Sequence, residues 1–218
     1  MKRRMISVQT VQRLPLYLSK VREAIAAGEE YISSAQLAKE LNLDPVLMRK
    51  DLAMTGAIGV PRLGFQAIGL RDAITSCLGW ENANEAIICG VGSLGQALLG
   101  YGGFRDHNLS IVLAFDTNPA LIGKKKHGVP VHELEKMDAL VRRLRVKIGI
   151  LCVPAFAAQE CADRMIASGI IGIWNFTPHK LNVPENVTVQ RVDLAASLAL
   201  LSHEIANRSR GESFKQGE

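Results

Sequence analysis

The spacing of apolar side chains changes along the chain near residue 80. Up to that point they recur every three or four positions, which is the spacing of amphipathic helices. Beyond it, short apolar runs alternate with helical stretches, and such alternation indicates a parallel sheet. The pattern therefore predicts an α/β protein, with a helical domain over residues 1–80 and a parallel-sheet domain over residues 81–192.

The first apolar stripe predicts a helix that Ser7 can cap and that Gly28 can end. Pro15 interrupts the stripe, so we expect a kink or a restart of the helix at that position. Residues 1–6 include three consecutive basic residues, and we expect them to form a disordered basic arm.

Two shorter helices are predicted next. Ser33 can cap the first, while Asp44 can cap the second and Pro45 suits its first turn. A short helix, a turn and a second helix form the helix-turn-helix pattern, in which the second helix lies in the major groove of DNA. That helix would expose Arg49 and Lys50. An ordinary helix pair with two surface charges has the same spacing, so the spacing alone leaves both interpretations open.

Residues 56–66 contain three glycines, one proline and a single cation, Arg62. This composition suits a β-hairpin, which would be the wing of a winged-helix domain. The stretch 67–79 predicts a helix with inward-facing residues Ile68, Ala73, Ile74 and Leu78. A polar linker over residues 79–85 follows, and we place the domain boundary there.

Beyond the linker, the apolar runs predict strands at 86–90, 110–115, 129–131, 147–153, 170–175 and 187–192. Helices are expected up to about residue 99 and at 133–144 and 156–168. A last helix over 193–207 carries an apolar stripe of Leu194, Leu198, Leu201 and Ile205. The stripe predicts packing on a second subunit, although docking on its own sheet would also bury it. Residues 208–218 are polar, and we expect a disordered tail.

The first strand of the sheet runs into a Gly-x-Gly-x-x-Gly turn at Gly90, Gly92 and Gly95. In a dinucleotide-binding fold the first glycine permits the turn, the second lets a pyrophosphate approach the backbone, and the third lets the next helix pack closely. That helix points its free N–H groups at the phosphates. The candidate cradle is the segment Gly90, Val91, Gly92, Ser93, Leu94 and Gly95.

An acid, Asp116, ends the second strand about 20 residues after the turn, as this fingerprint requires. Its carboxylate would accept hydrogen bonds from ribose hydroxyls and repel a 2′-phosphate, which favours NAD(H) over NADP(H). The lysines at 124–126 could hold a phosphate, but a solvated turn also explains them. Loops after later strands would line the nicotinamide half, through Val153, Pro154, Asn175 and Phe176.

The net charge is +5, and residues 1–80 contain 11 basic and 7 acidic residues, so the helical domain carries most of the excess. This favours a nucleic-acid surface there. No apolar run could span a bilayer and no signal peptide is evident, which predicts the cytoplasm. The four cysteines and five histidines show no metal-ligand or catalytic spacing. We expect no metal and buried free thiols, with Cys77 and Cys161 as the alternative redox-sensing candidates.

The remaining length argues against an enzyme. Once the helical domain has taken about 80 residues, the rest of the chain is sufficient for one nucleotide-binding unit. Hydride transfer also needs a substrate pocket and a positioned acid or base. We therefore expect no catalytic residues. A small NAD-dependent oxidoreductase is kept as the first alternative to a binding protein.

Several segments resemble the Rex family of redox-sensing transcriptional repressors. The most specific are Arg13-Leu14-Pro15-Leu16-Tyr17 and Met48-Arg49-Lys50-Asp51-Leu52, and the match runs from about residue 5 to residue 206. The glycine turn, Ala114-Phe115-Asp116, Val153-Pro154-Ala155, Asn175-Phe176 and Val192-Asp193-Leu194 add to it. The resemblance implies a homodimer with a winged helix, a Rossmann domain that binds NAD(H), and a C-terminal helix swapped onto the partner. It also implies that NADH releases the protein from operator DNA and that NAD⁺ permits binding.

The resemblance further implies roles for single residues. Contacts to DNA would come from Arg49, Lys50, Arg62, Ser33 and Arg13. Arg13 would pair with Asp193 in the DNA-binding state. When NADH is bound, Tyr101, near the nicotinamide, would pair with Asp193 instead. One carboxylate with two rival partners is a two-state element, and a ligand that favours one partner shifts its population.

The chain departs from the family at the wing. Two positions that are basic in the family are Val60 and Pro61 here, and Arg62 stands one place later. Lost phosphate contacts would weaken DNA binding and flatten its salt dependence. A second alternative is therefore a CoA- or nucleotide-binding protein that has lost its operator.

Overall fold

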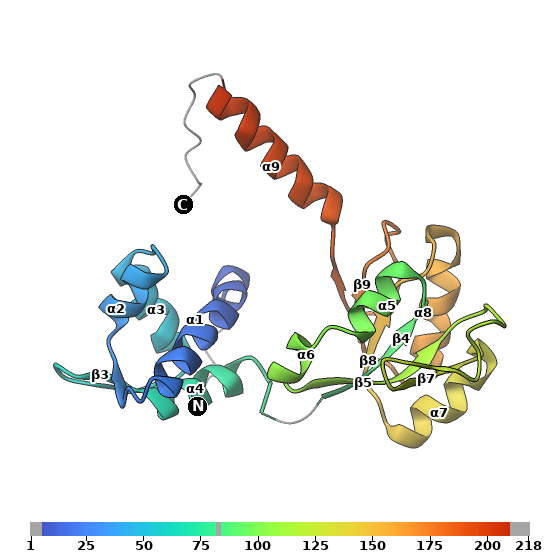
Figure 1. Ribbon diagram of the computed structural model, residues 1–218, viewed down its shortest axis with the longest axis horizontal. Coiled ribbons are helices and arrows are strands. Elements are labelled where there is room, and N and C mark those ends of the chain that lie inside the picture. Colours follow the sequence, from blue (N-terminus) through green and yellow to red (C-terminus); the bar gives the residue numbers. More distant parts are fainter. Residues whose placement is uncertain (1–5, 82–83, 210–218) are drawn as a thin grey trace. The chain divides into compact units, whose positions relative to one another are not determined.

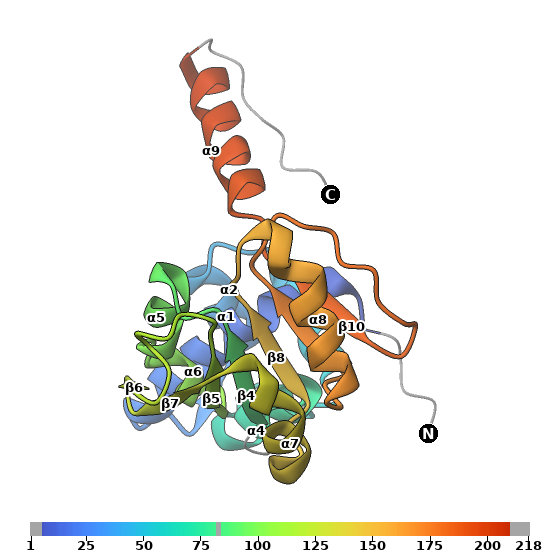
Figure 2. The ribbon, with the colours of Figure 1, turned by 90° about the vertical axis from the view of Figure 1, so that its right-hand side faces the viewer.

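Two units make up the chain, Met1–Ala83 and Asn84–Glu218. The computed structural model shown in Figures 1 and 2 describes residues 6–81 and 84–209. The expected N-terminal arm and C-terminal tail lie largely outside these residues. The α/β class is confirmed, with a helical first unit and a mostly parallel sheet in the second.

The first unit combines helices with a small antiparallel sheet. Its helices are α1 (Val8–Ala26), α2 (Ser34–Glu40), α3 (Pro45–Met54) and α4 (Ala67–Cys77). The strands β1 (Tyr31–Ile32), β2 (Gly59–Val60) and β3 (Gly64–Gln66) pair in the order β1-β3-β2. The hairpin β2–β3 is the expected wing, whereas β1 was not expected. The core is made by Leu14, Tyr17, Leu18, Val21, Ile32, Leu37, Ala38, Met48, Leu52, Ala67, Leu70 and Ile74.

The expected restart at Pro15 is wrong, because α1 is one helix through this residue. Proline removes a backbone hydrogen bond and costs a helix interior about 3 kcal/mol or more. The burial of Leu14, Tyr17, Leu18 and Val21 along one face of α1 opposes that cost. Packing in the folded unit therefore overrides the local preference.

The inward face of α4 was also partly misjudged. Ile68 is 49% exposed, while Ala67, Leu70 and Ile74 are buried. The helix begins at Ala67, whose backbone N–H donates to the carbonyl of Glu30 at 2.9 Å. This bond ties the start of α4 to the residue before β1.

The second unit is built on a seven-stranded sheet with the order β10-β9-β8-β4-β5-β7-β6. All neighbouring strands are parallel except β6, which runs antiparallel to β7. The parallel strands follow the order of the doubly wound dinucleotide-binding fold, with its switch point between β4 and β8. Their bounds are β4 (Asn84–Cys89), β5 (Leu109–Phe115), β7 (Val129–His132), β8 (Ile148–Leu151), β9 (Gly172–Asn175) and β10 (Thr188–Arg191).

Alternate residues of β4 face two different cores. Ile87 and Cys89 pack with the helices α7 (Met137–Leu144) and α8 (Ala158–Ala167) on one face of the sheet. Ala86 and Ile88 pack on the other face, which α5 (Ser93–Leu99) covers. Figure 1 shows α6 (Gly103–Asp106) beside β5, and this short helix was not expected. Short 3₁₀ turns, η1 (Leu134–Lys136) and η2 (Ala155–Ala157), precede α7 and α8.

The three consecutive lysines lie in a hairpin rather than in a plain turn. Lys125 and Lys126 form β6, which pairs with Pro130 and Val129 of β7. The connecting residues, His127 and Gly128, both have positive φ, at 50° and 84°. Two such residues form the tight turn whose twist matches a hairpin.

The C-terminal helix α9 (Leu194–Ser209) stands clear of the sheet in both views of the ribbon (Figures 1 and 2). The four residues of its apolar stripe are between 55% and 66% exposed. The alternative in which the stripe docks on its own sheet is therefore not seen.

Candidate functional site

The glycine turn is shaped by close backbone contacts. Gly90 has φ +94°, and a Cβ there would lie 2.5 Å from the carbonyl oxygen of Cys152. A Cβ on Gly95 would lie 2.0 Å from the carbonyl oxygen of Gly90. Gly92 has no heavy atom within 4 Å of such a position, so the space above it is open. The turn thus has the two tight contacts and the one open approach that the pyrophosphate cradle requires.

Asp116 lies directly beside this turn. Its carboxylate accepts hydrogen bonds from the backbone N–H of Val91 at 2.6 Å and of Asn118 at 2.8 Å. The acid therefore connects the end of β5 to the glycine turn after β4. At this place a carboxylate can accept hydrogen bonds from the hydroxyls of a ribose whose phosphates lie over Gly92.

The carboxyl ends of the strands bring most of the expected cofactor residues to one edge. Cys89 pairs with Phe115 and with Leu151, and Leu151 pairs with Asn175. The N–H of Cys152 donates to the carbonyl of Cys89 at 2.8 Å, which places the following Val153 and Pro154 next to the turn.

Asn175 is 1% exposed, and its side chain forms hydrogen bonds with the loop that follows β9. Its amide nitrogen donates to the carbonyl of His179, and its oxygen accepts from the backbone and hydroxyl of Thr177. A direct bond from this side chain to a cofactor would require the loop to open. Asn175 therefore shapes the edge of the site in the present structure.

Aromatic side chains connect two of the expected residues, Tyr101 and Phe176. Tyr101 packs edge-on against Phe104 with ring centres 4.9 Å apart, and Phe104 meets Trp174 at 5.7 Å. Trp174 then packs against Phe176 at 5.0 Å. Phe104 follows Tyr101 in one of the Rex-like segments, but no role was predicted from the sequence for it or for Trp174, because neither carries a charge. Tyr101 is 58% exposed, so the chain of rings ends at the surface.

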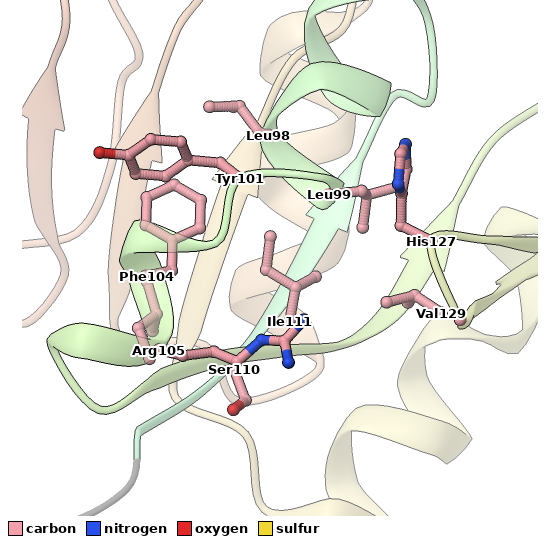
Figure 3. Close-up of a pocket in the computed structure, with 11 residues that line it drawn as sticks. Leu98, Leu99, Tyr101, Phe104, Arg105, Ser110, Ile111, His127 and Val129 are labelled. Carbon is pink, nitrogen blue, oxygen red and sulfur yellow. The ribbon is translucent and has the colours of Figure 1, made fainter.

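A cavity of about 260 Å³ lies beneath the end of α5, as Figure 3 shows. Among its lining residues are Leu99, Tyr101, Phe104, Ile111 and Val129. The residues from β5 and β7 come from the beginnings of these parallel strands, whereas the glycine turn follows the carboxyl end of β4. The cavity is therefore separate from the cradle, and of the expected cofactor residues only Tyr101 lines it.

In the first unit, α3 presents the two expected base-contacting residues. The carboxylate of Asp44 caps the helix by accepting from the N–H groups of Val46 and Leu47 at 2.7 and 2.9 Å. Met48 and Leu52 are buried, which leaves Arg49 and Lys50 on the exposed face.

Two more of the five expected DNA contacts lie at the start of α2 and at the tip of the wing. Ser33 caps α2 by accepting from the N–H of Gln36 at 3.0 Å. Arg62 has φ +67° within a turn closed by the N–H of Leu63 and the carbonyl of Val60 at 3.2 Å. Pro61 thus occupies the second position of this turn and Arg62 the third, where glycine is usual.

A buried carboxylate, Asp51, holds α3 against α1. It accepts from Arg13 Nε at 2.7 Å and Nη2 at 2.9 Å, from the Tyr17 hydroxyl at 2.8 Å and from the Thr10 hydroxyl at 2.9 Å. Burial alone would raise the pKa of Asp51, but these hydrogen bonds, led by that of Arg13, lower it below the ordinary value. Burial, and then the hydrogen bond to Asp51, raise the pKa of Tyr17 to about 12. Asp51 stands in the Rex-like segment Met48-Arg49-Lys50-Asp51-Leu52, but no role was predicted for it from the sequence.

The three expected switch residues have separate contacts in the single chain. Arg13 pairs with Asp51, and Asp193 pairs with Arg191 Nη2 at 2.8 Å. Asp193 also accepts from the N–H of Ala196 at 3.0 Å, so it caps α9. Their expected pairing stays a prediction about the dimer.

All four cysteines are free. Cys89 and Cys161 are buried, and a hydrogen bond between them raises the pKa of Cys89 and lowers that of Cys161. Burial raises the pKa of Cys152 to about 12. Within residues 6–81 and 84–209, no group of three potential His, Cys, Asp or Glu ligands could hold a metal ion. No helix in the same ranges is long and apolar enough to cross a membrane.

Comparison with known proteins identifies the family. One family model, described as a putative DNA-binding protein N-terminus, matches residues 5–53, and a CoA binding domain model matches residues 81–179. The chain is 42% identical over 200 residues to the redox-sensing transcriptional repressor Rex of Treponema denticola, covering 92% of this chain and 95% of that protein. The chain belongs to the Rex family. Rex of Bacteroides fragilis is 40% identical over 196 residues, covering 90% and 89% of the two chains.

Solved Rex structures have the same fold. A Rex-family repressor, RSP, in complex with NAD⁺ and operator DNA superposes with a TM-score of 0.86 at 33% identity, covering 97% of this chain and 100% of that chain. The same repressor in complex with NADH gives a TM-score of 0.82 at 33% identity, covering 95% and 97%. The Rex relatives named above are regulators, and their names describe no enzyme.

Proposed function

We propose that this protein is a transcriptional repressor that binds operator DNA through its first unit and NAD(H) through its second, and that NADH releases it from DNA. The observation that carries the proposal is the open glycine cradle beside Asp116, in a chain 33% identical to a Rex-family repressor solved with NAD⁺ and operator DNA. A regulator of this kind is not an enzyme. Its place would be the cytoplasm, where the operators are.

The cradle suits a dinucleotide in three respects. The space above Gly92 admits a pyrophosphate, and the first turn of α5 has no side-chain cap, so its backbone N–H groups can donate to phosphate oxygens. The carboxylate of Asp116 would exchange its bond to Val91 for bonds to ribose hydroxyls. Val153, Pro154 and Phe176 would line the nicotinamide half, together with Trp174.

The first unit suits a DNA duplex. Arg49 and Lys50 project from α3, the helix that would enter the major groove. Ser33 and Arg62 would contact the backbone on either side of it. Arg13 would act with them, although its guanidinium is held by Asp51.

We further propose a homodimer joined through α9. Its four stripe residues are more than half exposed, and a second copy would bury them. In that dimer Asp193 would meet Arg13 in the DNA-binding state and Tyr101 in the NADH state. The exchange would first have to break the pairing of Asp193 with Arg191.

The test is a titration of the full-length protein against an AT-rich palindromic operator at fixed salt, with and without NADH or NAD⁺. We expect a complex that survives NAD⁺ and dissociates with NADH. Arg49→Ala should abolish it, whereas Lys39→Ala, an exposed cation on α2, should leave it largely intact. A complex indifferent to NADH, or none at all, would remove the proposal.

A second candidate is a nucleotide-binding protein with little DNA affinity, which the wing favours. Ile58, Val60 and Leu63 are 87%, 39% and 53% exposed there, around the single cation Arg62. In this case NADH binding would persist while no operator complex forms, and basic residues at positions 60 and 61 would restore one.

A further inference from the structure

The most completely bonded charge among the described residues is Asp51, and it lies outside the dinucleotide site. Its side chain is 4% exposed and accepts four hydrogen bonds of 2.7 to 2.9 Å. Two come from the guanidinium of Arg13 in a side-on pair, one from Tyr17 and one from Thr10. A buried carboxylate with this many donors is held in a single orientation.

The donors all come from one face of α1. Thr10, Arg13 and Tyr17 follow the i, i+3, i+7 spacing, so they lie in a row along the helix. Asp51 belongs to α3 and comes directly after Arg49 and Lys50. Because neighbouring residues of a helix are about 100° apart, the direction fixed for Asp51 also fixes the directions of the two cations.

Apolar packing alone would fix the orientation of α3 less precisely. Met48 and Leu52 bury the same face of α3, but apolar contacts are not directional. A buried ion pair adds little net stability compared with well-packed apolar residues, while it does fix geometry. The pair between Arg13 and Asp51 is thus better suited to orienting α3 than to stabilising the unit.

Arg13 also reaches the surface. Its side chain is 26% exposed. A carboxylate that approaches Arg13 from outside can therefore bind it while Asp51 still holds Nε and Nη2. Such an approach would pull on Asp51 and hence on α3.

We propose that Asp51 is a positioning residue for operator recognition, which orients Arg49 and Lys50 and carries to α3 any change at Arg13. This rests on the proposed function, because it needs an operator complex that NADH dissociates. Asp51 itself touches neither DNA nor cofactor in this scheme. Its loss should therefore reduce discrimination between operator and random DNA, and should also reduce the response to NADH.

The test uses the full-length variants Asp51→Asn and Asp72→Asn. Both remove one negative charge from the first unit, but the side chain of Asp72 is 62% exposed and pairs with its neighbour Arg71. The added positive charge alone would strengthen binding to any DNA. We would measure affinity for operator and for random DNA at fixed salt, affinity for NADH without DNA, and the factor by which NADH weakens operator binding.

For Asp51→Asn we expect operator affinity to fall roughly tenfold or more, on the scale of a lost charge-assisted pair. Affinity for random DNA and for NADH should stay at the level of Asp72→Asn, and the NADH factor should shrink. An Asp51→Asn protein that keeps wild-type discrimination and the wild-type NADH factor would overturn the proposal. A wild-type protein without an NADH-sensitive complex would instead remove the proposed function.

Milder variants cover the case in which Asp51→Asn does not fold. Tyr17→Phe and Thr10→Val each remove one donor and keep the shape of the side chain. We expect each to lower discrimination by a few fold, and the two together to lower it further. If both fold and retain the wild-type discrimination, the carboxylate is only structural and the proposal fails.

Discussion

The backbone contacts of single glycines determine whether the cradle can form. A Cβ at Gly95 would lie 2.0 Å from the carbonyl oxygen of Gly90, and backbone cannot move away as a flexible side chain can. We expect Gly95→Ala to displace the glycine turn, to cost about 1–3 kcal/mol of stability and to weaken NADH binding at least tenfold. Isothermal titration with NADH and a denaturant melt of the same samples would measure both effects.

Gly102→Ala is the matched control for this change. Gly102 has no heavy atom within 4 Å of a built Cβ, and its φ of −63° suits any residue. The control should bind NADH like the wild type. If Gly95→Ala did the same, the close contact between helix and strand would not be needed for the cradle.

Asp51 also predicts how the first unit responds to acid. Its pKa is lower in the folded chain than in the unfolded chain, so the unfolded chain takes up the proton first as the pH falls. The stability contributed by Asp51 should be complete above the ordinary carboxyl value of about 4 and should be lost below it. Trp80 packs on the core of the first unit, and Trp174 belongs to the second. Denaturant melts of a Trp174→Phe protein, followed by Trp80 fluorescence, would therefore report the first unit.

In that background, the loss of stability at acid pH, here called the acid limb, should be smaller for Asp51→Asn, because the amide does not titrate. Asp72→Asn should retain the limb, since its carboxylate is largely exposed. An equally steep limb in Asp51→Asn would show that another carboxylate is responsible.

Among single residues, the sequence revealed those whose spacing along the chain is set by the ligand that they would bind. It did not reveal residues that only folding brings together. Gly90, Gly92, Gly95 and Asp116 follow a fingerprint, and the structure brings them together. The partners of Asp51 lie 34 to 41 positions away in the chain, and no local pattern links them. The same holds for Phe104 and Trp174, which meet only across the folded sheet.

Among the elements, α9 makes the clearest prediction. Leu198 and Leu201 lie on its apolar stripe and are 63% and 55% exposed. We expect Leu198→Glu to weaken the homodimer strongly, because it would place a charge in the buried interface. Ala199→Glu, on another face of α9, should leave the dimer intact. Sedimentation equilibrium over a range of concentrations would compare the two, and equal dimer constants would contradict a dimer built through this stripe.

The wing makes a second prediction at this scale. Each phosphate neutralised contributes about 0.9 to the slope of log affinity against log salt. A basic residue at position 60 of both wings of a dimer should therefore steepen the slope by roughly 2. We propose Val60→Lys as the variant, since Pro61 occupies a turn position that proline suits. The control for added charge is Ile68→Lys, which replaces an exposed apolar residue on α4. Identical slopes in the two variants would exclude the wing from the interface.

Long periodic elements were predicted well, whereas several very short ones outside the wing were not. The helices from α1 to α4 and the parallel strands all appear near their expected places. The strands β1 and β6 have two residues each, and α6 has four, which is too few for a period to be recognised. In addition, β1 depends on pairing with the distant strand β3.

At the scale of the whole molecule, the function requires that two binding equilibria be coupled. If NADH lowers operator affinity by some factor, thermodynamic linkage requires operator DNA to lower NADH affinity by the same factor. We expect this equality in the wild-type protein, measured by titrating NADH into the free and the operator-bound dimer. Unequal factors would show that the titrations are not at equilibrium, or that a third species binds.

Tyr101→Phe should separate the coupling from the binding. The substitution keeps the ring that packs on Phe104 and removes only the hydroxyl proposed to take Asp193. NADH affinity without DNA and operator affinity without NADH should change little, while both coupling factors should fall toward one. A Tyr101→Phe protein with normal coupling would show that the exchange at Asp193 does not carry the signal. The aromatic chain from Tyr101 to Trp174 offers another route for the coupling, and Trp174→Leu would interrupt it.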